Sequence, residues 1–480
     1  MKIKLLIILY TFFALKSHAQ KVFKGIKYDL QTGFIAASDT NTPFLLHANT
    51  FGQIPQKANF GFSNFGLTKE YDSLYTKTQK LKKFNFGYGL DFHANYGKVK
   101  QILLPEAYLK FRYGGFEFTG GRRKQIQGLT DSTLSSGAYV YSGNALPIPM
   151  LQLTTPNWIY LGKNKRFSFK TGLSHGWFGT QGIIENFYIH QKWLYFKIND
   201  KKQKVQLMGG INHQAQWGGY SEELKKIERE YASPTINGYL APYPLYSYQF
   251  IVLPFLQKFV NMDPNKIPGY GRGLAVGNQL GSVDLCAIFN QNLKFYHQKP
   301  FDFARSLVNF NNIEDGIYGF AWQSKSPKSI LQHITGEFIY TKSQGLYRFG
   351  KYQESNFGEF DNYFSHGQYQ SWSYNSNILG TPYILLNPDK RTIYSNRVKV
   401  YYLVFSGYYK RINFLGKMSL SQNFGTYGNT LSLKRNSFLL NTNKEVFRKI
   451  RLNVSIAQDV GSLYPNSIGI SFGINKTFIY

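Results

Sequence analysis

Three short segments of the chain place histidine or amide groups beside tryptophan. They are His175-Gly-Trp177, the run Phe187 to Trp193 with His190 and Lys192, and His213 to Trp217 with two glutamines. Flat indole faces suit the apolar faces of sugar rings, and polar groups beside them fix the orientation of a bound sugar. A single tryptophan would be better explained as an anchor at a membrane interface. The grouping favours a sugar-binding surface.

Two further segments carry charge and tight turns. Gly120-Gly121-Arg122-Arg123-Lys124 ends a predicted strand with three positive charges, and Tyr141 to Pro149 is turn-rich, with Asn144 and two prolines. Arginine grips carboxylates in a bidentate fork. The predicted polysaccharide contacts are Arg122, Arg123, Asn144, His175, Trp177, His190, His213 and Trp217.

Motifs for catalysis are weak. Asp361-Asn362, His366 and Ser371 supply the residue types of a Ser-His-Asn hydrolase, but a triad is assembled from separate strands or loops, not from one short segment. The histidines lack the spacing of a metal site, and Gly271 to Gly277 lacks the spacing of a nucleotide-binding loop. We therefore predict no catalytic residue, no metal ligand and no cofactor.

The elements that position these residues are strands. Between Lys83 and Tyr96, aromatic and aliphatic residues alternate with polar residues and glycine, and Ser467 to Tyr480 repeats the pattern at the end of the chain. Such alternation predicts strands with one lipid-facing side and one polar side. Gly114-Gly115 separates two such runs, as in a two-residue hairpin.

The first 19 residues read as an export signal. Lys2 and Lys4 precede an apolar stretch, and Ser17-His18-Ala19 is a small-x-small cleavage pattern, so residues 1–19 are predicted to be removed. Beyond this segment no run of 18 or more apolar residues could form a membrane helix. The only cysteine, Cys286, cannot form an internal disulfide.

The remaining residues, 20–480, are predicted to form a single all-β domain, a transmembrane antiparallel β-barrel of the bacterial outer membrane. The chain length fits about 16 to 20 strands, and we predict 18. Aromatic residues make up 18% of the chain while the mean hydropathy is −0.32, which suits aromatic girdles around a polar interior. A secreted β-sandwich or propeller explains the last strand less well. Residues 221–268 are predicted to be a long loop or insertion over the pore, with a short helix near its start.

The formal net charge is +30, from 56 Lys and Arg against 26 Asp and Glu. For an exported protein, an excess this large favours acidic glycans or the phosphates of lipopolysaccharide as neighbours, and no nucleic acid is expected. The further partners expected of a barrel are outer-membrane lipid and, during biogenesis, the barrel assembly machinery. We expect six of the predicted contacts to lie toward the lumen or its outer mouth: Arg122, Arg123, Trp177, His190, His213 and Trp217.

A family resemblance rests on eight segments in order along the chain. They are Y-S-G-N-A-L-P-I-P (141–149), S-H-G-W (174–177), Y-I-H-Q-K (188–192), H-Q-A-Q-W-G-G (213–219), E-D-G-I-Y-G (314–319), D-N-Y-F (361–364), L-G-T-P (379–382) and N-F-G-T-Y-G (423–428). The set resembles the Wzi-type capsule assembly family of Bacteroidetes-like bacteria. The resemblance implies an outer-membrane barrel that helps to hold capsular or extracellular polysaccharide and acts as a lectin. The periplasmic helical bundle of the best-described members is not expected, because residues 42–66 read as strands and turns.

The predicted function is therefore binding of surface polysaccharide, and assistance in capsule or exopolysaccharide assembly or attachment, without catalysis. A porin or specific channel is the main alternative. A lipid-modifying outer-membrane enzyme and a purely structural or adhesive barrel are the others.

Overall fold

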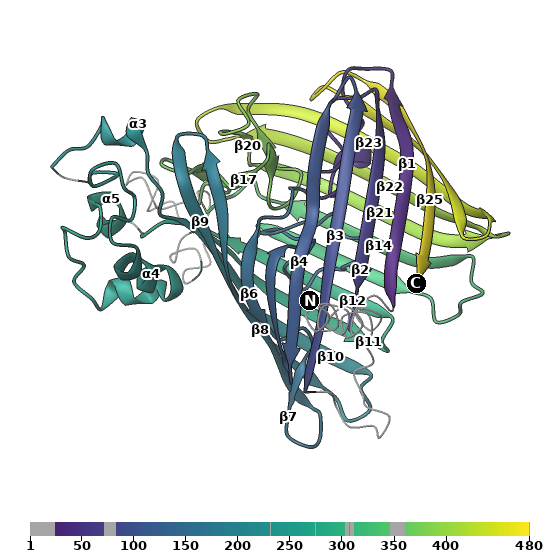
Figure 1. The fold of residues 1–480 in the computed structure, drawn as a ribbon, viewed down its shortest axis with the longest axis horizontal. Helices are drawn as coiled ribbons and strands as arrows, with labels where there is room; N and C mark the ends of the chain where they lie inside the picture. Colours follow the sequence, from purple (N-terminus) through teal and green to yellow (C-terminus); the bar gives the residue numbers. More distant parts are fainter. Residues whose placement is uncertain are drawn as a thin grey trace, which may run out of the picture.

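The computed structural model describes residues 25–71, 83–230, 232–273, 275–302, 307, 312–345 and 361–479. The export signal predicted at residues 1–19 lies outside these ranges. The described residues form one large antiparallel sheet that closes on itself (Figure 1). The fold class predicted from the sequence, an outer-membrane β-barrel, is confirmed.

The described barrel has 18 strands. Their bounds are β1 Ile26–Ala37, β2 Phe60–Lys69, β3 Phe84–Gly97, β4 Gln101–Tyr113, β5 Phe116–Arg122, β6 Met150–Thr154 with β7 Ile159–Leu161, β8 Phe167–Gln181, β9 Ile184–Asn199, β10 Val205–Trp217, β11 Asn278–Phe289, β12 Leu293–Phe301, β13 Gly316–Gln323, β14 Leu331–Tyr340, β21 Val398–Tyr409, β22 Ile412–Gly425, β23 Thr430–Phe447, β24 Ile450–Gly461 and β25 Ser467–Ile479. The short β6 and β7 both pair with β8 and act as two halves of one strand. Pairing of β1 with β25 closes the ring.

Alternation along each strand separates a lipid face from a luminal face. On β3, Leu90 and Phe92 are exposed on the outer surface, whereas Asp91 and His93 are buried inside. On β25, Ile468 and Ile470 are exposed, whereas the alternate residues Ser467 and Gly469 are buried. The register predicted for both strands is confirmed.

The two ends of the barrel differ in the length of their connections. At one end lie the start of β1, the end of β25 and short turns, among them Gly114-Gly115, where Gly114 has the positive φ (59°) that such a turn requires. At the other end lie the long connections 38–59, 123–149, 218–277 and 341–397. Because short turns of outer-membrane barrels face the periplasm, the long connections face the cell exterior.

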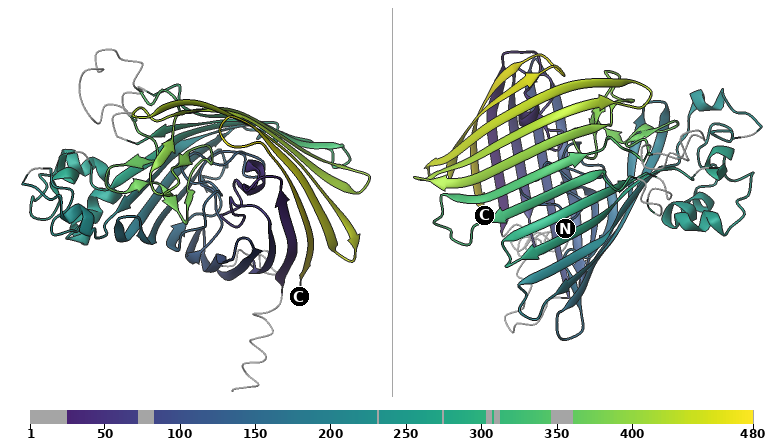
Figure 2. Two further views of the ribbon diagram at one scale, coloured as in Figure 1. Left: turned by 90° about the horizontal axis from the view of Figure 1, so that it is seen from above. Right: turned by 180° about the vertical axis from the view of Figure 1, so that it is seen from behind.

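Three of these outer connections fold back into the lumen and form a plug. We use this name for the described parts of residues 38–59, 123–149 and 361–397, which include α2 Phe44–His47 and the short strands β15 Ser365–His366, β16 Gln370–Ser371, β17 Ser373–Tyr374, β18 Asn377–Ile378, β19 Leu385–Leu386 and β20 Ile393–Ser395. Figure 2 (left) shows the first of these connections, residues 38–59 in dark purple, inside the curve of the strands.

The plug is bound both to itself and to the wall. The Tyr139 amide donates to Gln298 Oε1 of the wall at 2.9 Å, and the Ser136 amide donates to Glu337 Oε2 at 2.7 Å. Within the plug, Ser142 Oγ donates to the Gly380 carbonyl at 2.7 Å. These contacts satisfy buried polar groups that would otherwise cost free energy. The outer half of the lumen is therefore packed with side chains.

The connection between β10 and β11 is not part of the plug. It carries α3 Glu222–Lys225, α4 Pro244–Val252, η1 Pro254–Lys258 and α5 Gly269–Gly273, and so holds more helix than the sequence predicted. Its helices project beyond the wall of the barrel (Figure 1), and α4 packs against the outward face of β9. The predicted position over the pore is therefore wrong for α4. No helix of the described ranges is long and apolar enough to cross a membrane.

Candidate functional site

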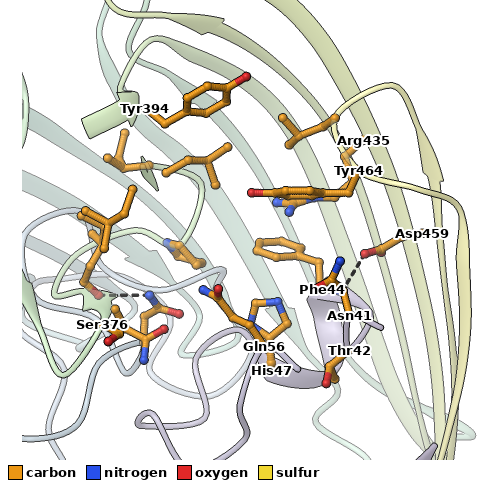
Figure 3. A pocket seen from close by; sticks show the side chains of 18 of the residues that line it. Asn41, Thr42, Phe44, His47, Gln56, Ser376, Tyr394, Arg435, Asp459 and Tyr464 are labelled. Atoms are coloured by element: carbon orange, nitrogen blue, oxygen red, sulfur yellow. Dashed lines mark hydrogen bonds between the residues drawn. The ribbon is translucent and has the colours of Figure 1, made fainter. Parts of the chain in front are cut away.

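A cavity of about 520 Å³ opens at the outer mouth of the barrel, between the plug and the outer ends of β23, β24 and β25 (Figure 3). We call it the outer-mouth pocket. Its polar and aromatic lining residues are Asn41, Thr42, Phe44, His47, Gln56, Asn144, Ser376, Asn377, Lys390, Tyr394, Arg435, Asp459, Tyr464 and Ser467. Amide, hydroxyl and aromatic groups mixed in this way are typical of a small-ligand site.

Arg435 is the central charge of the pocket. It lies near the outer end of β23 in the luminal register, and its guanidinium carbon is 3.6 Å from the centre of the Phe44 ring and 5.9 Å from that of Tyr464 (Figure 3). Cation–π contacts of this kind hold the guanidinium group in one orientation. Arg435 Nε and Nη2 are buried and have no hydrogen-bond partner among the described residues. Arg435 lines the outer-mouth pocket, where its guanidinium can pair with a carboxylate or with sugar oxygens.

A hydrogen bond to the barrel wall holds α2 in place. The Phe44 amide donates to Asp459 Oδ2 at 2.8 Å, which brings an acidic group of β24 to the start of the short helix. Burial, together with the positive charges of Arg435 and Lys390, lowers the pKa of His47 to about 3. His47 is therefore neutral at physiological pH, and the cations Arg435 and Lys390 outnumber the anion Asp459 in the lining.

Acidification is expected to loosen α2 from the wall. The ordinary pKa of histidine is 6.5 and that of docked His47 is about 3, so between these values the released segment binds a proton that the docked segment does not. The contribution of neutral His47 to the stability of the docked segment is complete above pH 6.5 and is lost progressively as the pH falls toward 3. Hydrogen exchange at the Phe44–His47 amides, corrected for intrinsic rates, should be faster at pH 4.5 than at pH 7.

A matched variant isolates this effect. His47→Asn removes the titrating group and should reduce the pH dependence of exchange. Equal protection of the wild-type amides at both pH values would contradict the role assigned to His47.

Three of the predicted contacts lie on the luminal side. Asn144 lines the outer-mouth pocket, and its Nδ2 donates to the Ile378 carbonyl at 3.0 Å, which joins two parts of the plug. Arg122 Nη2 donates to the Tyr374 hydroxyl at 2.8 Å, and Arg123 Nη1 pairs with Glu117 Oε1 at 2.6 Å. Neither arginine lines the outer-mouth pocket. A binding role for these residues stays a prediction.

The other five predicted contacts come together, but on the outer surface of the barrel. They are His175 and Trp177 on β8, His190 on β9, and His213 and Trp217 on β10. His175 lies 5.1 Å from Trp177 and 5.7 Å from Trp217, measured between ring centres. Trp177, His190, His213 and Trp217 were predicted to lie toward the lumen or its outer mouth. That prediction is wrong, because the alternate residues face the lumen: Ser174, Gln191 and Gln214 form a hydrogen-bonded chain that reaches the plug at the Val140 carbonyl.

The segment carrying α4 covers this outward cluster. The Tyr248 hydroxyl of α4 lies 3.1 Å from His190 Nδ1, and its ring centre is 5.1 Å from that of Trp217. This cover explains how histidines come to occupy the register that elsewhere faces lipid.

The residue types that suggested a hydrolase are not arranged as a triad. His366 Nδ1 accepts hydrogen bonds from the Gln368 and Tyr369 amides, and the Ser371 hydroxyl bonds to that of Ser373 at 2.9 Å. Among the residues that the structure describes, no group of three or more His, Cys, Asp or Glu side chains is placed to hold a metal ion.

Sequence reasoning missed the centre of the pocket. Arg435 shares its register with Ser437 and Asn441, so alternation along β23 would have placed it in the lumen. Phe44 and Tyr464 come from two connections far apart in the chain, and no local pattern brings them together.

The closed barrel and its register define a class: the protein is a bacterial outer-membrane β-barrel. No family model matches the chain, and no curated protein matches it. Among solved structures, the chain is similar to Wzi of Escherichia coli, described as an outer-membrane protein involved in group 1 capsule assembly and as a carbohydrate-binding β-barrel. The identity is 13%, the match covers 97% of this chain and 87% of Wzi, and the TM-score is 0.57.

Other matches are weaker. OmpF of Salmonella typhi, solved in complex with daunomycin, is 8% identical with a TM-score of 0.42, and OccAB4 of Acinetobacter baumannii is 8% identical with a TM-score of 0.37. Each match covers 95% of this chain and 98% of the other.

Proposed function

We propose that this protein binds an acidic polysaccharide at the outer-mouth pocket and helps to hold it at the cell surface, as a Wzi-type barrel and without catalysis. The observation that carries the proposal is Arg435, whose guanidinium lines the pocket and is held between two aromatic rings. The capsule role and carbohydrate binding described for Wzi, which has a similar fold, give further support.

The pocket suits an acidic sugar in both shape and charge. The Tyr464 ring offers an apolar face to a sugar ring, amides such as Asn377 can bond to hydroxyls, and Arg435 can pair with a carboxylate. The net positive charge of the chain attracts a polyanion over a longer range. Because exposed charges are screened beyond about 8 Å at physiological salt, this attraction weakens as ionic strength rises.

Direct binding tests the proposal. Purified barrel is titrated with polysaccharide isolated from the same strain, and in parallel with the same polymer after reduction of its carboxyl groups. We expect binding at low salt, weaker binding at high salt and a preference for the acidic form. Gene deletion should move polysaccharide from the cell-bound to the released fraction. The proposal fails if the purified barrel has no affinity for the polymer at low salt.

Conductance separates this proposal from a porin. Because the plug packs the outer half of the lumen, we expect the intact barrel to give no stable current step in planar bilayers. Replacing residues 126–147 by a short Gly-Ser turn removes part of the plug and should allow current to pass. Free conduction by the intact barrel would favour the porin.

A further inference from the structure

A second cavity hollows the outer surface of the barrel, beneath the connection between β10 and β11. Its volume is about 680 Å³, and it lies between outward-facing side chains of the wall and η1. We call it the lateral groove. Its apolar lining comes from Leu153, Leu173, Leu194 and Ile211 of the wall and from Pro254 and Phe255 of η1. These wall residues occupy the register that faces lipid.

The lateral groove changes from apolar to cationic along its length. Leu194 and Ile211 are cross-strand partners, and the next outward-facing pair toward the cell exterior is Lys192 and His213. Lys258 of η1 lines the groove too, as does one acidic residue, Asp302. His213 Nε2 lies 2.8 Å from Gln279 Oε1, while its buried Nδ1 has no hydrogen-bond partner among the described residues. Apolar side chains below and the ammonium groups of Lys192 and Lys258 above match an outer-leaflet lipid with a phosphorylated headgroup.

The segment beside the groove presents apolar side chains outward. Leu245 of α4 is 92% exposed, and Phe259 just after η1 is 79% exposed. Side chains this apolar are stable at the surface of a barrel when they enter the lipid leaflet. The segment is anchored to the wall, because Lys192 Nζ donates to the Ile251 carbonyl at 2.9 Å at the end of α4. It lies outside the barrel, beside β9 (Figure 1).

We propose that the lateral groove binds a phosphorylated glycolipid of the outer leaflet, with an acyl chain along Leu194 and Ile211 and a phosphate near Lys258 and Lys192. The segment of α4 and η1 then lies in the outer leaflet and covers the bound lipid. The site goes beyond the proposed polysaccharide binding and shares no lining residue with the outer-mouth pocket.

Native mass spectrometry of the full chain tests this site. The detergent-purified barrel is mixed with diphosphorylated lipid A, with its dephosphorylated form and with phosphatidylethanolamine. We expect the phosphorylated glycolipid to bind best. Lys258→Glu reverses the charge of an exposed residue and should reduce that binding about tenfold, as expected when a charged contact of about 1.4 kcal/mol is lost. Lys226→Glu, in the same connection but outside the lateral groove, should leave it unchanged.

A groove-filling variant gives a second test. Ile211→Trp should lower binding of both lipid A forms, whereas Ile470→Trp, on the lipid face of β25, should not. Both substitutions place an apolar ring on the outer surface, and heat-modifiable migration checks that each barrel is folded. Equal binding of phosphorylated lipid A to the wild type and to folded Lys258→Glu and Ile211→Trp would overturn the site, as would no binding by the wild type. Polysaccharide affinity, measured separately, reports on the outer-mouth pocket alone.

Discussion

Replacing Tyr464 by alanine is expected to lower polysaccharide affinity about tenfold, at low and at high salt alike. Tyr464 lies in the connection between β24 and β25, is 45% exposed and lines the outer-mouth pocket beside Arg435. In the proposed site we expect its ring to make short-range contact with a sugar, and contact of this kind is not screened by salt. Titration of the purified variant with the strain's own polysaccharide at two salt concentrations measures the effect.

Tyr408→Ala is the matched control. Tyr408 is 44% exposed and lies near the periplasmic end of β21, so its loss should not alter affinity. Lys390→Gln removes a pocket charge and should instead reduce the dependence of binding on salt. If Tyr464→Ala and Tyr408→Ala bind the polymer equally well, the outer-mouth pocket is not the site.

Arginine at Ile474 is expected to destabilise the barrel by about 2 to 4 kcal/mol, the cost of a charge near the bilayer midplane. Ile474 lies in the middle of β25, in the register that faces lipid. Urea unfolding of the barrel in lipid vesicles, followed by tryptophan fluorescence and by heat-modifiable migration, measures the loss.

The adjacent residue provides the comparison. Asn475 faces the lumen, and its Nδ2 donates to Asp29 Oδ1 at 2.7 Å. Arginine at this position stays on the luminal side and can pair with the same carboxylate, so the cost should be about 0 to 1 kcal/mol. Similar losses for the two variants would mean that the register of β25 is wrong.

Strand positions and their two faces were predictable because alternation is a local property. Phe92 and Asp91 on β3 could be assigned to lipid and to lumen from their immediate neighbours. The error at Trp177 arose when residue type was given more weight than this pattern. Trp177 alternates in step with Leu173 and His175, and both face outward. The cover that makes a polar outward position stable comes from α4, which is distant in sequence.

Few residues of the candidate site could be predicted from the sequence. Asn144 could be predicted, because a turn-rich segment with two prolines indicates a fixed loop. It lines the outer-mouth pocket. Arg435 was missed, although its register was readable. Its partners Phe44 and Tyr464 could not be predicted, because the path of each connection is set by tertiary contacts such as that between the Phe44 amide and Asp459.

Contacts between residues that are far apart in the sequence affect the order in which parts of the molecule fold. The Phe44 amide and Asp459 are separated by 415 residues, and Asn144 and Ile378 by 234. Such contacts form only after the strands that carry them have paired, because closing long loops is slow. We therefore expect a newly closed barrel to pass through a stage in which its lumen is still open. We expect substitutions that delay docking of the plug to make growing cells leaky to small solutes, even where the mature protein conducts nothing.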